Sequence, residues 1–185
     1  MNEFFAYLAQ FGRLTPPQQD LIARHATRVT LRKGDYMVAQ QMGFVEAGVL
    51  RICSYTEQGE ELTRYFIEER EPILDIRRPE CAASPSPCLV QAITDCQLIV
   101  FTIQQWHAFA QDIPGWETLV QKIIAQTTWD KLLRVQPLLT QDAAARYQSF
   151  LTMYPQLANR VPLAYLASYL GMTQSSLSRI RKQIR

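Results

Sequence analysis

YLASYLGMTQSSLSRIRKQIR, residues 165–185, has the spacing of two short helices joined by a tight turn. Ala167 is a small residue at the position where two such helices cross, and Gly171 can adopt the left-handed conformation that the turn needs. Pro162 suits the first turn of the leading helix, and Thr173 is placed to cap the second. Apolar residues that would hold the pair together follow the same spacing: Leu166, Leu170, Met172, Leu177 and Ile180. The stretch therefore predicts a helix-turn-helix.

The second helix of this pair has a polar and basic face. At about 100° per residue, Leu177, Ile180 and Ile184 face the first helix. The residues that lead the opposite face, with Gln174 and Arg185 beside them, are Ser175, Ser178, Arg179 and Lys182. This pattern is typical of a helix that enters the major groove of DNA.

Each residue type on this face has an expected contact. A glutamine can pair with adenine and an arginine with guanine, so Gln174 and Arg179 are the expected base contacts. Ser175 and Ser178 are small enough to let the helix approach the groove. Phosphate contacts, which position a protein without reading sequence, are expected from Thr173, Ser176, Arg181, Lys182 and Arg185.

The charge of the chain is unevenly distributed. The net charge is +2, but residues 143–185 carry six Lys or Arg and no acidic residue, whereas residues 1–142 carry all 17 acids and 13 basic residues. These basic side chains could bind DNA, or they could only face water. Without acidic partners on the helix they would repel one another unless a polyanion neutralised them, which favours DNA.

Residues 28–103 have a different pattern, with short β-branched and aromatic runs broken at turns such as Gly34-Asp35 and Gln58-Gly59. This pattern predicts an antiparallel sandwich or barrel. Two short helices are expected before it, the second capped by Thr15. Four prolines in residues 71–88 indicate a long connection.

A long helix is predicted from Trp116 to about Leu139. Its apolar stripe could pair two copies of the chain as a coiled coil, or could pack on the barrel. We favour pairing, because a helix this long tends to extend beyond its own domain. The stripe consists of Trp116, Leu119, Val120, Ile123, Ile124, Leu132 and Leu133.

The order of these pieces resembles the bacterial CRP/FNR family of transcription regulators. The resemblance rests on LRKGDYMVA (31–39), FVEAGVLRICSYTEQGEELTRYF (44–66), the helix around 116–139 and RVPLAYLASYLGMTQSSLSRIRKQI (160–184), and it covers nearly the whole chain.

The resemblance implies an α+β fold in three parts. Residues 1–113 would form a sensor domain, an antiparallel β-roll of the cyclic-nucleotide-binding-like jelly-roll type. Residues 114–139 would form a dimerisation helix and 140–185 an all-α helix-turn-helix domain. The β-hairpin wing is expected to be truncated or absent.

The resemblance also implies a function. The chain would be a sequence-specific transcriptional regulator that binds a near-palindromic operator as a homodimer, and RNA polymerase is an open candidate partner. The family's base-reading positions fall on Gln174, Ser175 and Arg179.

The sensor part departs from the family members that bind cyclic AMP. Their Gly-Glu pair for the ribose falls here at Leu74-Asp75. Their Arg-Ser or Arg-Thr pair for the phosphate falls within Ser84–Pro87, where no arginine stands and two prolines remove backbone donors. Control by cyclic AMP is therefore not expected, and the effector stays open. The candidate ligand residues are Asp75, Arg77, Arg78, Ser84 and Ser86.

Other site chemistry finds little support. The four cysteines and two histidines show no metal-ligand spacing, so no metal or cofactor is expected, and iron–sulfur or haem sensing is not supported. A redox role for Cys81 and Cys88 stays open. Glu60-Glu61 and Glu68-Glu69 are expected to be solvated, and no catalytic set is visible, so an enzyme is not predicted.

The sequence also predicts where the protein is located and leaves one alternative function open. The first residues lack a signal-peptide pattern and no apolar run approaches the roughly 20 residues of a membrane span, so a cytoplasmic protein is expected. The alternative function is a ligand-sensing module whose helix-turn-helix makes only protein contacts.

Overall fold

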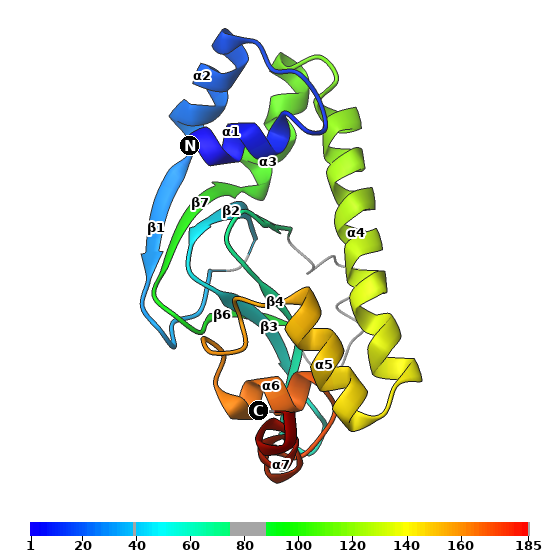
Figure 1. Cartoon of the computed structure of the whole chain (residues 1–185). Coiled ribbons are helices and arrows are strands. Elements are labelled where there is room, and N and C mark those ends of the chain that lie inside the picture. Colours follow the sequence, from blue (N-terminus) through cyan, green and yellow to red (C-terminus); the bar gives the residue numbers. More distant parts are fainter. Residues whose placement is uncertain (39, 75–87, 185) are drawn as a thin grey trace.

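The computed structural model describes residues 1–38, 40–74 and 88–184 of the chain. Within them, two antiparallel sheets form the body of the molecule (Figure 1). One has the strand order β1-β7-β2-β5 and the other β4-β3-β6. The strands are β1 (Thr27–Leu31), β2 (Gln41–Ala47), β3 (Leu50–Tyr55), β4 (Glu61–Ile67), β5 (Pro72–Ile73), β6 (Leu89–Ala92) and β7 (Cys96–Thr102).

A shared apolar core holds the two sheets face to face. It joins Val45, Leu98 and Val100 of the first sheet to Leu50 and Ile52 of the second, all with less than a tenth of their surface exposed. These positions lie in the β-branched runs of residues 28–103, so the predicted antiparallel roll is confirmed.

Three helices close one end of the roll: α1 (Asn2–Leu8), α2 (Pro16–His25) and α3 (Ile103–Asp112). Aromatic side chains fill the space beneath them, with Phe4 against Phe44 and Phe101. The predicted cap is present, because the Thr15 side chain takes part in a capping box with Gln18.

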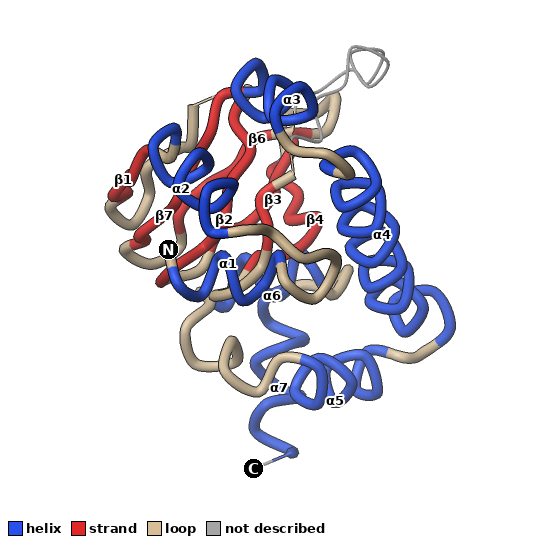
Figure 2. Tube along the Cα trace, turned by 90° about the horizontal axis from the view of Figure 1, so that it is seen from above, coloured by secondary structure: helices blue, strands red, loops and turns tan. Residues whose placement is uncertain are grey.

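A long helix, α4 (Trp116–Thr140), runs beside the two sheets (Figure 2). Its first half is part of the chain's own core, where Trp116, Leu119 and Ile123 are buried. Its second half leaves Leu132 and Leu133 exposed. The predicted stripe is therefore divided. The structure contradicts one continuous pairing face, because the first turns are needed to cover Phe101 and Trp106.

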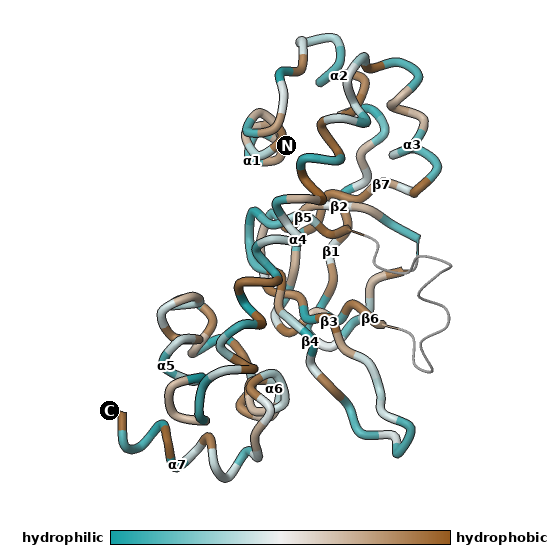
Figure 3. The backbone as a smooth tube through the Cα atoms, turned by 90° about the vertical axis from the view of Figure 1, so that its right-hand side faces the viewer, coloured by the Kyte–Doolittle hydropathy of each residue, from teal (hydrophilic) through white to brown (hydrophobic). Residues whose placement is uncertain are grey.

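The C-terminal helices gather at the end opposite α1–α3 (Figure 3). They are α5 (Ala143–Met153), α6 (Leu163–Tyr169) and α7 (Gln174–Ile184). Their core includes Phe150, Leu157 and Leu177, and it is continuous with Val49 and Phe66 of the roll. The α+β fold with a helical C-terminal part is thus confirmed.

No helix within the described residues is both long and apolar enough to cross a membrane.

Candidate nucleic-acid interface

The turn between α6 and α7 has the hydrogen bonds of a Schellman motif. Gly171 lies in the left-handed region, with φ at +64°. Its N–H donates to the Ser168 carbonyl at 3.2 Å, and the Met172 N–H donates to the Ala167 carbonyl at 3.1 Å. These bonds satisfy carbonyls that would otherwise be unpaired at the end of α6. The predicted glycine therefore ends one helix and allows the next to leave at an angle.

Buried side chains hold the two helices together. Leu166, Ala167, Leu170 and Leu177 have at most 2 % of their surface exposed. Met172 and Ile180 pack against the same cluster from its edge. Thr173 caps α7 as predicted, because its Oγ1 accepts the Ser176 N–H at 3.2 Å. The local structure is that of a helix-turn-helix.

The face of α7 that points away from this core carries most of the predicted DNA contacts. Ser178 lies toward its edge and is half-buried, as are Ser176 and Arg181, which flank the core-facing side. Arg185 lies outside the described residues. The members of the predicted set that are exposed are Thr173, Gln174, Ser175, Arg179 and Lys182.

Helix α6 packs on the edge of the β-roll at strand β4. The Thr63 N–H donates to Ser168 Oγ at 2.9 Å. The Arg51 guanidinium carbon lies 3.5 Å from the centre of the Tyr165 ring. The helix-turn-helix is therefore held against the roll through the helix that does not carry the predicted base contacts.

Arg51 is the centre of this contact, and sequence reasoning missed it. Its side chain is 1 % exposed, in a strand of otherwise uncharged residues. It donates to Gln91 Oε1 from Nε and Nη2, at 2.8 and 2.6 Å, and to Thr63 Oγ1 at 3.1 Å. Its ionic partner is Glu61, at 2.5 Å. The only signal in the sequence was an arginine inside the apolar run VLRIC.

The expectation that the two acidic pairs are solvated is wrong for Glu61, Glu68 and Glu69, which are half-buried. Glu61 holds Arg51, and Glu69 accepts two hydrogen bonds from Arg160, at 2.9 and 2.6 Å. Arg160 precedes α6, so the second ion pair also joins the roll to the C-terminal helices. Burial of the Arg51 guanidinium requires a carboxylate partner, whereas Arg160 is only half-buried.

The neighbouring carboxylates Glu68 and Glu69 have opposite pKa shifts. The hydrogen bonds from Arg160 lower the pKa of Glu69 to about 2. Burial, and then the negative charge of Glu71, raise the pKa of Glu68 to about 7. Glu71 itself is paired with Arg134 of α4. One carboxylate is thus fully ionised at neutral pH while its neighbour is partly protonated.

Glu68 is expected to make the fold less stable as the pH rises. The pKa of Glu68 is higher in the folded chain than in the unfolded chain, so between about pH 4.5 and 7 the folded state keeps a proton that the unfolded state releases. This proton stabilises the fold at low pH, and the stabilisation is lost as the pH rises through 7. Glu68→Gln should remove about 1 kcal/mol of the decline in unfolding free energy between pH 5 and pH 8, after allowance for solvent screening. Urea titrations at both pH values measure this. A parallel decline in both proteins would contradict it.

The candidate ligand residues Asp75, Arg77, Arg78, Ser84 and Ser86 lie outside the described residues, as does Cys81. Of the described cysteines, Cys53 and Cys96 are buried and Cys88 is half-buried, and all are reduced. No group of three potential metal ligands occurs in the described part of the chain. The predicted sensor chemistry therefore stays a prediction.

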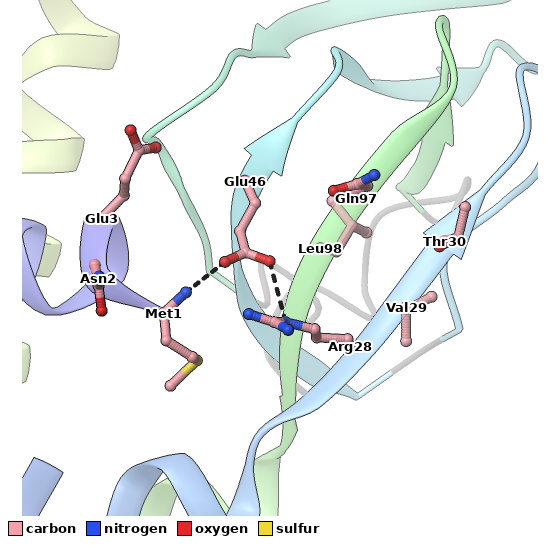
Figure 4. A pocket seen from close by; sticks show the side chains of 9 residues that line it. All are labelled: Met1, Asn2, Glu3, Arg28, Val29, Thr30, Glu46, Gln97 and Leu98. Carbon is pink, nitrogen blue, oxygen red and sulfur yellow. Dashed lines mark hydrogen bonds and ion pairs between the residues drawn. The ribbon is translucent and has the colours of Figure 1, made fainter.

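A surface cavity of about 530 Å³ lies where the N-terminus meets β1, β2 and β7 (Figure 4). The Met1 amine donates to Glu46 at 2.5 Å, and Arg28 lies 3.5 Å from the other oxygen of the same carboxylate. The two cations share the Glu46 carboxylate, so the cluster carries a net charge of +1.

No protein-family model and no curated protein sequence matches the chain. Solved structures do match it. A protein from Eubacterium rectale described as a CRP/FNR-family transcriptional regulator is 17 % identical, with a TM-score of 0.73 over 99 % of this chain and 87 % of that one. The chain shares that fold.

Two further solved structures are similar to the chain in fold. FixK2 from Bradyrhizobium japonicum is 18 % identical over 86 % of this chain and 84 % of its own, with a TM-score of 0.71. The c-di-GMP-responsive global regulator CLP from Xanthomonas campestris is 14 % identical over 92 % and 91 %, with a TM-score of 0.69. At these identities the likeness concerns the fold, and function rests on the residues of this chain.

Proposed function

We propose that the chain is a sequence-specific DNA-binding transcriptional regulator that acts as a homodimer, without catalytic activity, in the cytoplasm. The observation that carries the proposal is the exposed face of α7, where Gln174, Ser175, Arg179 and Lys182 stand on a helix supported by a buried core. No acidic residue follows Asp142, and among the described residues no carboxylate pairs with the arginines or the lysine of α7. The phosphate backbone of DNA would do so.

The second half of α4 supports the homodimer. Leu132, Val135 and Leu139 are 58 %, 41 % and 80 % exposed and recur at intervals of three and four residues, the spacing of a coiled-coil seam. Trp129 and Leu133 widen this apolar face, with 58 % and 47 % exposed. A second copy of the chain would cover it. Two α7 helices could then occupy half-sites about 34 Å apart.

Selection of bound duplexes from a random library tests the proposal. The expected product is a near-palindromic sequence whose half-sites are one helical turn apart. Its affinity should fall steeply between about 50 and 200 mM salt, since several phosphate contacts release counterions. Failure to enrich any sequence, or an affinity that salt does not change, would instead favour a ligand-sensing module whose helix-turn-helix contacts only proteins.

Charge on the exposed face of α4 is expected to separate the two copies. In the variant Leu132→Glu with Leu139→Glu, four carboxylates would be brought together in the dimer, where burial of unpaired charge is costly. The variant should elute as a monomer in light-scattering chromatography and keep its circular dichroism spectrum. Gln136→Glu, an exposed position on the same helix, is the control and should stay dimeric. A monomeric wild type would refute the dimer.

A further inference from the structure

A cavity of about 390 Å³ lies between α1, the β4–β5 turn and α4. Its size is within the range of small-molecule sites. Aromatic side chains form its apolar walls, among them Tyr7 of α1, Phe11 in the turn after α1 and Tyr65 of β4. The cavity is therefore a candidate site among the described residues.

Two adjacent residues of α4, Asp130 and Lys131, bring opposite charges to this cavity. Lys131 donates from Nζ to the Tyr65 hydroxyl at 3.1 Å, and its ammonium lies 4.4 Å from the centre of that ring. Asp130 accepts a hydrogen bond from the neutral amide of Gln126 at 2.8 Å. Across the described ranges, neither residue has an ion-pair partner within 4.0 Å.

The other charges that line the cavity are already neutralised. Arg134 is paired with Glu71, and Arg70 with Glu3. Lys131 is half-buried, and this burial lowers the pKa of its ammonium group. A partly buried cation gains from a carboxylate partner, and Asp130 can accept from an ammonium group.

We propose that this cavity binds a small zwitterion of the α-amino-acid type with an aromatic or large apolar side chain. The ligand carboxylate would pair with Lys131 and its ammonium with Asp130. The side chain would lie against Tyr7, Phe11 and Tyr65. A simple acid would leave Asp130 without an ammonium partner, and a simple amine would leave Lys131 without a carboxylate partner, so both charges of the ligand are needed.

Calorimetric titration of the full chain with L-phenylalanine tests this site without any DNA. Saturable binding is expected at millimolar concentrations or below. L-phenylalaninamide lacks the carboxylate and 3-phenylpropanoate lacks the ammonium, and each should bind about tenfold more weakly or worse. If L-phenylalanine, L-tyrosine, L-tryptophan and L-leucine all fail to bind, or if both analogues bind as well as L-phenylalanine, the proposal is wrong.

Variants of Lys131 and Asp130 test which side chain binds which charged group of the ligand. Lys131→Met should abolish the preference for L-phenylalanine over its amide, and Asp130→Asn the preference over 3-phenylpropanoate. Lys33→Met and Asp20→Asn remove the same charges from exposed positions elsewhere and should change neither preference. Thr127→Phe, which fills the cavity from α4 and keeps both charges, should abolish binding. Unchanged binding in Thr127→Phe would overturn the proposal even if the Lys131 variant failed to fold.

Discussion

Alanine at both Arg179 and Lys182 is expected to weaken binding to the selected duplex on the order of 10³-fold. A base-reading arginine contributes about 1–3 kcal/mol per half-site, and a homodimer loses it twice. Loss of Lys182 should also lower the slope of log affinity against log salt by about one unit for each half-site. Fluorescence anisotropy over a salt series measures both quantities. The fold should survive, because both side chains are exposed and neither contributes to the buried core.

The control is a variant with the same loss of charge elsewhere. Arg13→Ala with Lys33→Ala removes two exposed basic residues from the N-terminal part of the chain. It lowers the net charge equally, so any effect of the overall electrostatic field appears in both variants. A drop in affinity of the same size in the control would assign the effect to net charge rather than to α7. An α7 variant that binds like the wild type would exclude α7 as the recognition helix.

Replacing Arg51 by methionine is expected to lower the free energy of unfolding by about 3–4 kcal/mol, because one partner of a largely buried ion pair is removed. The change leaves Glu61 without its cation, and it removes the donors to Gln91 and Thr63, which are 8 % and 6 % exposed. The stacking on Tyr165 of α6 is lost as well. Equilibrium unfolding in urea gives the value.

Two further variants separate the causes. Arg64→Met is the control on the neighbouring strand, because that arginine is exposed and donates only to Ser54 among the described residues. It should cost less than about 1 kcal/mol. Adding Glu61→Gln to Arg51→Met should restore part of the stability, since the unpaired carboxylate is then removed. If Arg51→Met unfolds at the same urea concentration as Arg64→Met, the buried network does not stabilise the fold.

The local parts of the candidate site could be predicted from the sequence. The Gly171 turn, the Thr173 cap and the apolar spacing from Leu166 to Ile180 depend on residues within a few positions of one another. The exposed face of α7 followed from the same helical period. The β-roll could be predicted for a similar reason, because alternating β-branched runs and turn residues report on local backbone conformation.

The long helix shows where the sequence pattern was insufficient. Its apolar residues could face the barrel or a second copy, and one periodicity describes both cases. In the structure Trp116, Leu119 and Ile123 cover the core of the roll, whereas Leu132 and Leu139 remain exposed. The division depends on where the roll ends beside the helix, which is a property of the assembled fold.

By itself the sequence determined the helix-turn-helix and its charge: short-range spacing sets the turn between α6 and α7, and the charge of residues 143–185 is a matter of composition. Only the tertiary structure decided how that unit is held. Arg51 meets Gln91 and Tyr165 across 40 and 114 positions of the chain, and Glu69 meets Arg160 across 91. Lys131 and Asp130 line a common cavity only because α1 and β4 pack beside α4 in the folded chain. Such contacts join residues far apart in sequence, so no local period encodes them.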